Sequence, residues 1–185
     1  MNKRLAIVLV GGVLLAATTP SAQDKVNTKA SELATTSKAS LTALYAKAPL
    51  AKELAPKALA ILVFPKVKKA GLGIGGQYGE GALLKQGTAS AYYKTTGASI
   101  GLQAGGQQYG YAMFFMNANA LTQFTSANGF EVGVGPSVVF VDEGMAKTTT
   151  TNTLKDDIYA FVFGQKGLMA GLGLQGNKIT QIVPK

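Results

Sequence analysis

From Ala60 to the C-terminus, short apolar runs alternate with glycines, and this spacing constrains the fold more than any other feature of the chain. Most of the 23 glycines lie in this region. Glycine inside a strand permits sharp bends and close backbone approach, and many short, evenly spaced strands favour a barrel or a sandwich. We expect strands at 60–64, 70–75, 80–85, 88–94, 98–104, 109–116, 130–134, 137–142, 158–163, 168–174 and 178–183.

Two local signals refine this pattern. The apolar run Ala60–Phe64 stops at Pro65, which predicts a buried strand that ends there. Residues 117–126 mix polar and apolar side chains and begin with Asn117, a favoured N-cap, so we expect one short helix inserted among the strands. Strand alternation would send half of the strand tyrosines and phenylalanines inward, and we expect most of them in the core. The alternative is that some of the tyrosines line a mouth where a lipid tail or headgroup enters.

The segment 24–59 has a helical period and forms an arm before the strands. Pro49 can open a second short helix at its first position, while Pro56 is expected to shorten or kink it. The apolar stripe of the arm is weak, so we expect it to pack on the β-structure instead of inserting deeply into a bilayer. Its members recur at steps of three and four residues: Val26, Ala30, Leu33, Ser37, Leu41, Leu44 and Ala48.

These patterns predict an α+β fold that is mainly β. We expect a Gly-rich antiparallel barrel-like or sandwich β-structure with an N-terminal amphipathic helical arm and one short inserted helix. The arm (24–59) and the β-rich body (60–185) together form a single domain, 23–185.

The first 22 residues are typical of a secretory signal peptide. Lys3 and Arg4 precede the apolar run 5–17, and small residues follow it, so cleavage is expected near Ala22 or Gln23. The alternative is an uncleaved anchor, but the run is shorter than the roughly 20 residues that span a bilayer. We therefore expect an exported protein of the periplasm or cell envelope.

The charge is basic and is carried by lysine. Loss of the signal peptide lowers the formal net charge from +9 to +7, because Lys3 and Arg4 leave with it, and no arginine remains. A lysine ammonium is a hydrated point charge on a flexible stem, whereas arginine offers a rigid fork for phosphates and base edges. This balance favours diffuse attraction to an anionic surface and argues against a nucleic-acid partner.

Enzyme chemistry has little support. The chain contains no Cys and no His, which excludes disulfides, thiolate chemistry, His-based metal sites and a Ser-His-Asp triad. A carboxylate pair is conceivable, but nothing in the spacing brings two acids together. We expect no catalytic residue, no metal and no cofactor. The acids considered are Glu80, Glu131, Asp142 and Glu143, and a turn before a strand is expected for Asp156 and Asp157.

Residues 71–76 match the glycine pattern of a dinucleotide-binding turn. That reading requires a following helix and an acid about 20 residues on. Here a non-helical stretch begins at Gln77, and position 96 is Thr. We therefore interpret the glycines as a structural bend.

Lysines gather on the arm and directly after the first strand. Three of them lie within four positions at 66–69, which suits either a solvated turn or part of a positive face. Together with the arm lysines they could hold an anionic bilayer, since each contributes about 1 kcal/mol near such a surface. The candidate lipid-binding residues are Lys66, Lys68, Lys69, Lys25, Lys29 and Lys38.

Four segments, in this order, resemble the SYLF-domain family: Ala60–Ala82, Ala98–Gly106, Gly129–Gly135 and Ile158–Gly176. This family is also described in eukaryotes as a lipid-binding and actin-patch module. The resemblance implies binding of anionic lipids, phosphoinositides among them in eukaryotic members, through a basic N-terminal helix. It also implies that the protein is not an enzyme.

The first hypothesis is a lipid-binding module that attaches peripherally to anionic phospholipid through a Lys-rich face. The alternative is a structural or protein-interaction component of the bacterial cell envelope without a lipid ligand. A third, a hydrolase with a Ser-Lys or carboxylate site, has the least support.

Overall fold

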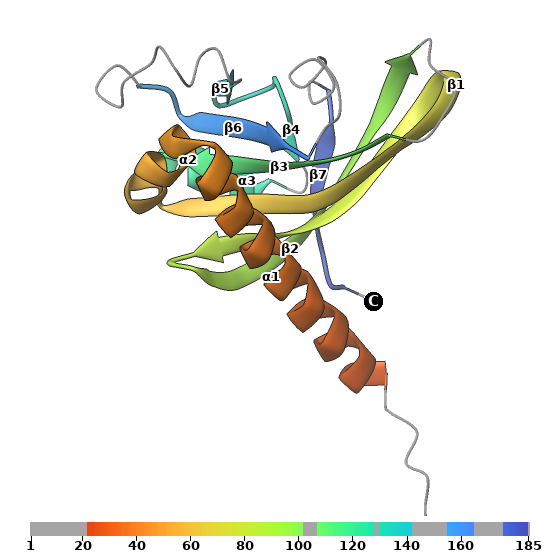
Figure 1. The fold of residues 1–185 in the computed structure, drawn as a ribbon, viewed down its shortest axis with the longest axis horizontal. Helices are drawn as coiled ribbons and strands as arrows, with labels where there is room; N and C mark the ends of the chain where they lie inside the picture. Colours follow the sequence, from red (N-terminus) through yellow and green to blue (C-terminus); the bar gives the residue numbers. More distant parts are fainter. Residues whose placement is uncertain (1–21, 102–106, 128–129, 142–154, 165–175, 185) are drawn as a thin grey trace, which may run out of the picture.

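The computed structural model describes residues 22–101, 107–127, 130–141, 155–164 and 176–184 (Figure 1). Helix α1 leads through α2 and a short 3-10 turn, η1, into the sheet, and α3 lies between β3 and β4. The helical elements are α1 (Ala22–Lys47), α2 (Pro49–Leu54), η1 (Ala55–Lys57) and α3 (Ala118–Ser126). The strands are β1 (Ala60–Lys85), β2 (Thr88–Gly101), β3 (Gln107–Phe115), β4 (Phe130–Glu131), β5 (Val138–Val141), β6 (Ile158–Phe163) and β7 (Lys178–Ile182).

The described strands form one sheet, in the order β4-β7-β2-β1-β3-β6-β5, curved into a half-barrel. This confirms the α+β, mainly-β prediction in its barrel-like form. The pairs are antiparallel, as expected, except for β5 and β6, which run parallel at one edge of the sheet. Two parallel strands start at the same end of the sheet, so the chain between them must be long enough to return there, and a tight hairpin is too short. The connection between β5 and β6 is long enough.

Strand β1 does not end at Pro65, contrary to the prediction. The ladder between β1 and β3 shifts register between Phe64 and Val67, so Pro65 lies at a bulge where a missing N–H removes no ladder hydrogen bond. Lys66, Lys68 and Lys69 therefore lie within a strand and not in a loop.

The two halves of β1 have different partners. Residues 60–69 pair with β3, and residues 73–85 pair with β2, so the runs expected separately at 70–75 and 80–85 belong to one strand. The second half also passes closely over the first. A Cβ at Gly79 would lie 2.8 Å from the Lys66 carbonyl oxygen, and one at Gly81 would collide with the Val63 carbonyl oxygen. Glycine is needed at both positions because two backbones approach each other there.

The inner face of the sheet carries one apolar core, closed by α3. Leu62, Phe64 and Tyr111 are buried there. The Phe124 ring from α3 lies with its centroid 4.7 Å from that of Tyr93 and 4.9 Å from that of Phe115. The prediction that most strand aromatics are core residues is confirmed, since Tyr93, Tyr109, Tyr111, Phe114, Phe115 and Phe161 are buried and Tyr92 and Phe163 are half-buried.

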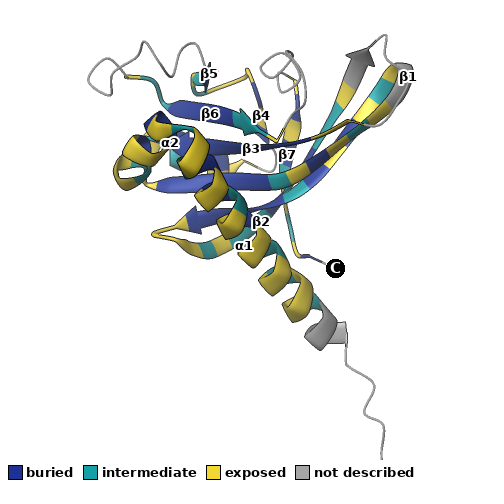
Figure 2. Ribbon diagram, in the orientation of Figure 1, coloured by how far each residue is buried: buried dark blue, intermediate teal, exposed yellow. Residues whose placement is uncertain are grey.

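The outer face carries a second core, covered by α1 and α2. Leu41, Leu44 and Leu54 pack there against a layer that includes Val63 and Phe114. Figure 2 shows buried positions along the strands and mostly exposed positions along the projecting turns of α1. In the central strands, some side chains therefore point into the inner core and others into the outer core.

The helical arm has the expected form. Its stripe faces the sheet, with Leu41 and Leu44 buried and the Ser37 hydroxyl donating to the Val63 carbonyl oxygen at 3.4 Å. Pro49 stands in the first turn of α2, and α2 gives way to a 3-10 turn before Pro56. The arm packs on the β-structure as expected, and the N-terminal turns of α1 extend past the sheet (Figure 1).

The short helix α3 also has the expected cap. The Asn117 side chain accepts a hydrogen bond from the Ala120 N–H at 2.9 Å and donates to Asp157 Oδ1 at 2.6 Å. This bond, followed by that from the Ser137 N–H, holds the pKa of Asp157 below its usual value. Asp156 and Asp157 lie directly before β6, as predicted. The cap therefore fastens α3 to the start of β6.

Several expectations are only partly tested. The strand expected at 130–134 is limited to Phe130–Glu131. The strand at 168–174 and the signal segment up to residue 21 lie outside the described residues, and α1 begins at Ala22. No helix in the described part of the chain is long and apolar enough to cross a membrane.

Candidate functional site

A groove of about 440 Å³ lies on the outer face of the sheet, between α1 and β1. We call it the lysine groove. Its α1 wall and its β1 wall each carry both charged and uncharged side chains. The lining residues are Lys29, Glu32, Leu33 and Thr36 from α1, and Pro65, Lys66, Lys68, Tyr78, Gly79 and Glu80 from β1.

Regular periodicity explains why these residues meet. The α1 positions follow steps of three and four residues, so they share one face of the helix. Lys66 and Lys68 are two apart on β1 and point to the same side, whereas Val67 between them is buried in the inner core. The bulge at Pro65 sets this phase, because it shifts the alternation just before Lys66.

Three of the six predicted lysines are brought together. Lys29, Lys66 and Lys68 line the groove. Lys69 follows the same alternation as Val67 and therefore belongs to the opposite face of β1.

The other two arm lysines do not contribute to the groove as described. Lys38 follows Lys29 by nine residues, about two and a half helical turns, so it is exposed on the other side of α1. Lys25 lies in the first turn of α1, and its side chain lies outside the described part of the structure. The positive face expected from the sequence is thus smaller than the full set of lysines.

The sequence patterns did not indicate that two carboxylates lie in the groove. Glu32 and Glu80 line it beside the three lysines. The Tyr78 hydroxyl donates to Glu80 Oε1 at 2.5 Å, and this bond, then burial and the negative charge of Glu80, raises the pKa of Tyr78 to about 12. Alternation along β1 would have placed Glu80 and Lys66 on one face, but the apparent strand end at Pro65 concealed this.

The groove is chemically suited to holding an anion. Lysine ammonium groups donate to phosphate or carboxylate oxygens, and Tyr78 offers an aromatic wall beside them. Of the acids considered from the sequence, Glu131 lies in β4, away from the groove, while Asp142 and Glu143 lie outside the described residues. Among described residues, no group of three His, Cys, Asp or Glu side chains is placed to hold a metal ion.

A buried polar cluster lies on the inner face and was also missed. The Tyr109 hydroxyl donates to Gln77 Oε1 at 2.6 Å, and Gln77 Nε2 donates to Asn177 Oδ1 at 2.5 Å. Burial raises the pKa of Tyr109 to about 12. Gly97 leaves room for this cluster, since a Cβ there would collide with the Asn177 amide oxygen. The cluster ties the residue before β7 to β1 and β3.

Replacing Tyr109 with phenylalanine tests this role. The variant loses the hydroxyl that donates to Gln77, so we expect the free energy of unfolding to fall by about 1–2 kcal/mol. Urea denaturation measures it. Tyr92→Phe, at a half-buried tyrosine of β2, is the control and should change stability by less than about 0.5 kcal/mol. Equal midpoints for the two variants would contradict a fastening role for Tyr109.

The model of a known protein family matches part of the chain. Residues 96–182 match the model of a family described as "Ysc84: Las17-binding protein actin regulator". The match begins within β2 and ends with β7, so it includes Tyr109 and Asn177, whereas every residue of the lysine groove precedes it. No curated protein matches the chain.

Proposed function

We propose that this protein, a member of the SYLF family by the match of residues 96–182, is a non-catalytic module that binds anionic membrane lipids through the lysine groove. The match confirms the family expected from the sequence. What we propose is the ligand. This proposal rests on the lysine groove, whose lining residues all precede the matched residues in the sequence.

One observation carries the proposal: Lys29 of α1 and Lys66 and Lys68 of β1 line the same groove. Each lysine near an anionic bilayer contributes about 1 kcal/mol, so three acting together support useful adhesion. Glu32 and Glu80 oppose this attraction in part, but the Tyr78 hydroxyl engages one oxygen of Glu80. The exposed lysines then form the nearest contacts for a phosphate headgroup.

The remaining parts of the proposal are supported by the sequence alone. The protein is exported to the periplasm or cell envelope after cleavage of residues 1–22, and it contacts the membrane peripherally without a cofactor. Its partner is anionic phospholipid, and neither nucleic acid nor a metal takes part. The absence of arginine from residues 23–185 supports diffuse contact with headgroups over base readout.

Co-sedimentation with vesicles tests the proposed function. The chain from Gln23 onward should sediment with phosphatidylglycerol vesicles and not with phosphatidylcholine vesicles. Raising the ionic strength from about 0.01 M to about 0.15 M shortens the Debye length from about 30 Å to about 8 Å, so binding should weaken strongly. Equal binding to both vesicle types, or binding that ignores salt, would contradict an electrostatic groove.

A protein-binding role is the second candidate. The family description names Las17 binding and actin regulation for the family. In this chain, Ile74 and Val183 are large apolar side chains with exposed fractions of 79% and 69%, so each is accessible to a protein partner. If the protein does not bind anionic vesicles even at low ionic strength, protein binding replaces lipid binding as the favoured function.

A further inference from the structure

Three buried polar atoms on the inner face of the sheet have no hydrogen-bond partner among the described residues. They are Thr95 Oγ1, the Tyr111 hydroxyl oxygen and Asn177 Nδ2. All three residues lack exposed surface, so bulk water does not reach them. Buried polar groups in folded proteins are nearly always hydrogen-bonded, so three such atoms in one protein indicate a partner that is not part of the chain.

Strand geometry brings the three side chains together. Thr95 and Gly97 are two positions apart on β2, so both face the same side of the sheet. A Cβ at Gly97 would collide with the Asn177 amide oxygen, so Asn177 packs over this position and lies diagonally from Thr95. Tyr109 and Tyr111 are two apart on β3, and their rings stack with centroids 6.3 Å apart.

The hydroxyls of Tyr111 and Thr95 are neighbours that are not bonded to each other. Burial raises the pKa of Tyr111, and the nearby Thr95 hydroxyl lowers it in part. Neither oxygen has a hydrogen-bond partner in the described structure, so the two lie close without a direct bond. Two polar groups that face each other across such a gap are commonly joined by a bridging water.

The chemistry of the three atoms specifies their partner. Asn177 Nδ2 can only donate, whereas the hydroxyls of Thr95 and Tyr111 can donate or accept. A water molecule meets all three demands at once, and a buried water typically makes about three hydrogen bonds. An ion does not suit the site, because these side chains and the neighbouring Gln77 and Tyr109 carry no charge to balance it.

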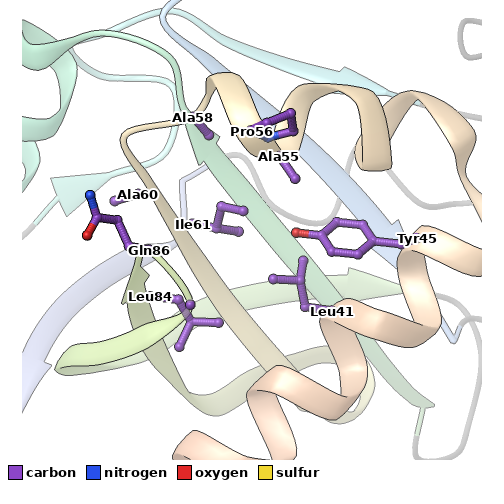
Figure 3. A pocket seen from close by; sticks show the side chains of 10 residues that line it. Leu41, Tyr45, Ala55, Pro56, Ala58, Ala60, Ile61, Leu84 and Gln86 are labelled. Carbon is purple, nitrogen blue, oxygen red and sulfur yellow. The ribbon is translucent and has the colours of Figure 1, made fainter.

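The hollow on the outer face shows what an unselective site looks like (Figure 3). It has a volume of about 330 Å³ and lies between α1, η1 and the turn after β1. Its lining mixes apolar side chains with the Gln86 side chain and the Tyr45 hydroxyl, so it favours no one class of ligand. The three inner atoms, by contrast, define both the number and the kind of hydrogen bonds that their partner makes.

We propose that one water molecule is held inside the sheet, where it bridges the Asn177 amide to the hydroxyls of Thr95 and Tyr111. This water links β2, β3 and the residue before β7, and it adds to the direct bond between Gln77 and Asn177. The site shares no residue with the lysine groove, so it stands or fails independently of lipid binding.

A crystal structure of the unaltered protein, at a resolution that shows ordered waters, tests the site directly. A water oxygen should lie within about 2.6–3.2 Å of Asn177 Nδ2, Thr95 Oγ1 and the Tyr111 hydroxyl oxygen. A direct hydrogen bond between the two hydroxyls, density for a larger molecule, or no density between the three atoms would overturn the inference.

Thr95→Val tests the site through the sign of its effect on stability. The substitution keeps the shape of the side chain and removes the hydroxyl, so a bridging water loses one partner and the urea midpoint should fall. If no water is bound, the variant removes a buried hydroxyl without a partner, and the midpoint should rise. Thr88→Val makes the same change at an exposed position of β2 and should leave the midpoint nearly unchanged. A midpoint of Thr95→Val at or above that of the unaltered protein would count against the water.

A measurement of long-lived waters completes the test. Nuclear magnetic relaxation dispersion of the solvent counts water molecules that stay bound longer than the protein takes to tumble. The double variant Thr95→Val, Tyr111→Phe removes two of the three partners, so it should hold one long-lived water fewer than the unaltered protein. Equal numbers in the two folded proteins would overturn the inference, and the crystal structure decides if the double variant does not fold.

Discussion

Replacing Gly81 with alanine is expected to lower the free energy of unfolding by about 3 kcal/mol. A Cβ at this position would collide with the Val63 carbonyl oxygen and would lie 2.8 Å from Cδ1 of Phe64. Both obstacles belong to the buried centre of the sheet, where Val63 and Phe64 have no exposed surface. Relief would require the two halves of β1 to separate, and this would loosen both apolar cores. Urea denaturation with the linear extrapolation measures the change.

Gly76→Ala is the matched control for this substitution. Gly76 lies in the same strand, but the nearest atom to its Cβ would be the Gly97 carbonyl oxygen at 4.0 Å, an ordinary contact. We expect a change of less than about 1 kcal/mol, because the alanine meets no obstacle and reduces the entropy of the unfolded chain. If both variants unfold at the same urea concentration, β1 does not cross itself at Gly81.

Reversing the three groove lysines should abolish most binding to anionic vesicles. Each lysine contributes about 1 kcal/mol, so removing three weakens binding about a hundredfold, and the added glutamates weaken it further by repulsion. The variant is Lys29→Glu, Lys66→Glu and Lys68→Glu, compared with the unaltered protein on phosphatidylglycerol vesicles at low ionic strength. All three side chains are exposed, so the fold should be retained.

A second triple variant separates placement from net charge. Lys38, Lys155 and Lys178 are exposed lysines that do not line the groove, and replacing them with glutamate changes the net charge by the same amount. This variant should keep most of its vesicle binding. Equal losses in the two variants would show that overall charge, and not the groove, holds the membrane.

Features encoded within one element could be predicted. The stripe from Val26 to Ala48 identified the sheet-facing side of α1, because helical period and burial report the same face. Asn117 marked the start of α3, because an N-cap acts within one turn. Strand β6 was expected at 158–163 and was found there, since a continuous apolar run signals a strand buried on both faces.

Features that depend on pairing between distant segments could not be predicted. Pro65 reads as a strand end in isolation, and only the register shift against β3 shows why the strand continues. Six lysines could be selected by sequence position, but the side of the sheet that Lys66, Lys68 and Lys69 face depends on that same shift. The Gln77–Asn177 hydrogen bond joins residues 100 apart in the chain, which no local pattern reports.

The position of β1 has a consequence for how the molecule comes apart. In the described sheet, β2, β7 and β4 lie to one side of β1, and β3, β6 and β5 lie to the other. Backbone pairing between these two wings passes through β1 alone among the described strands. Each wing is held by a different half of this strand, so losing the whole of β1 would detach both wings at once.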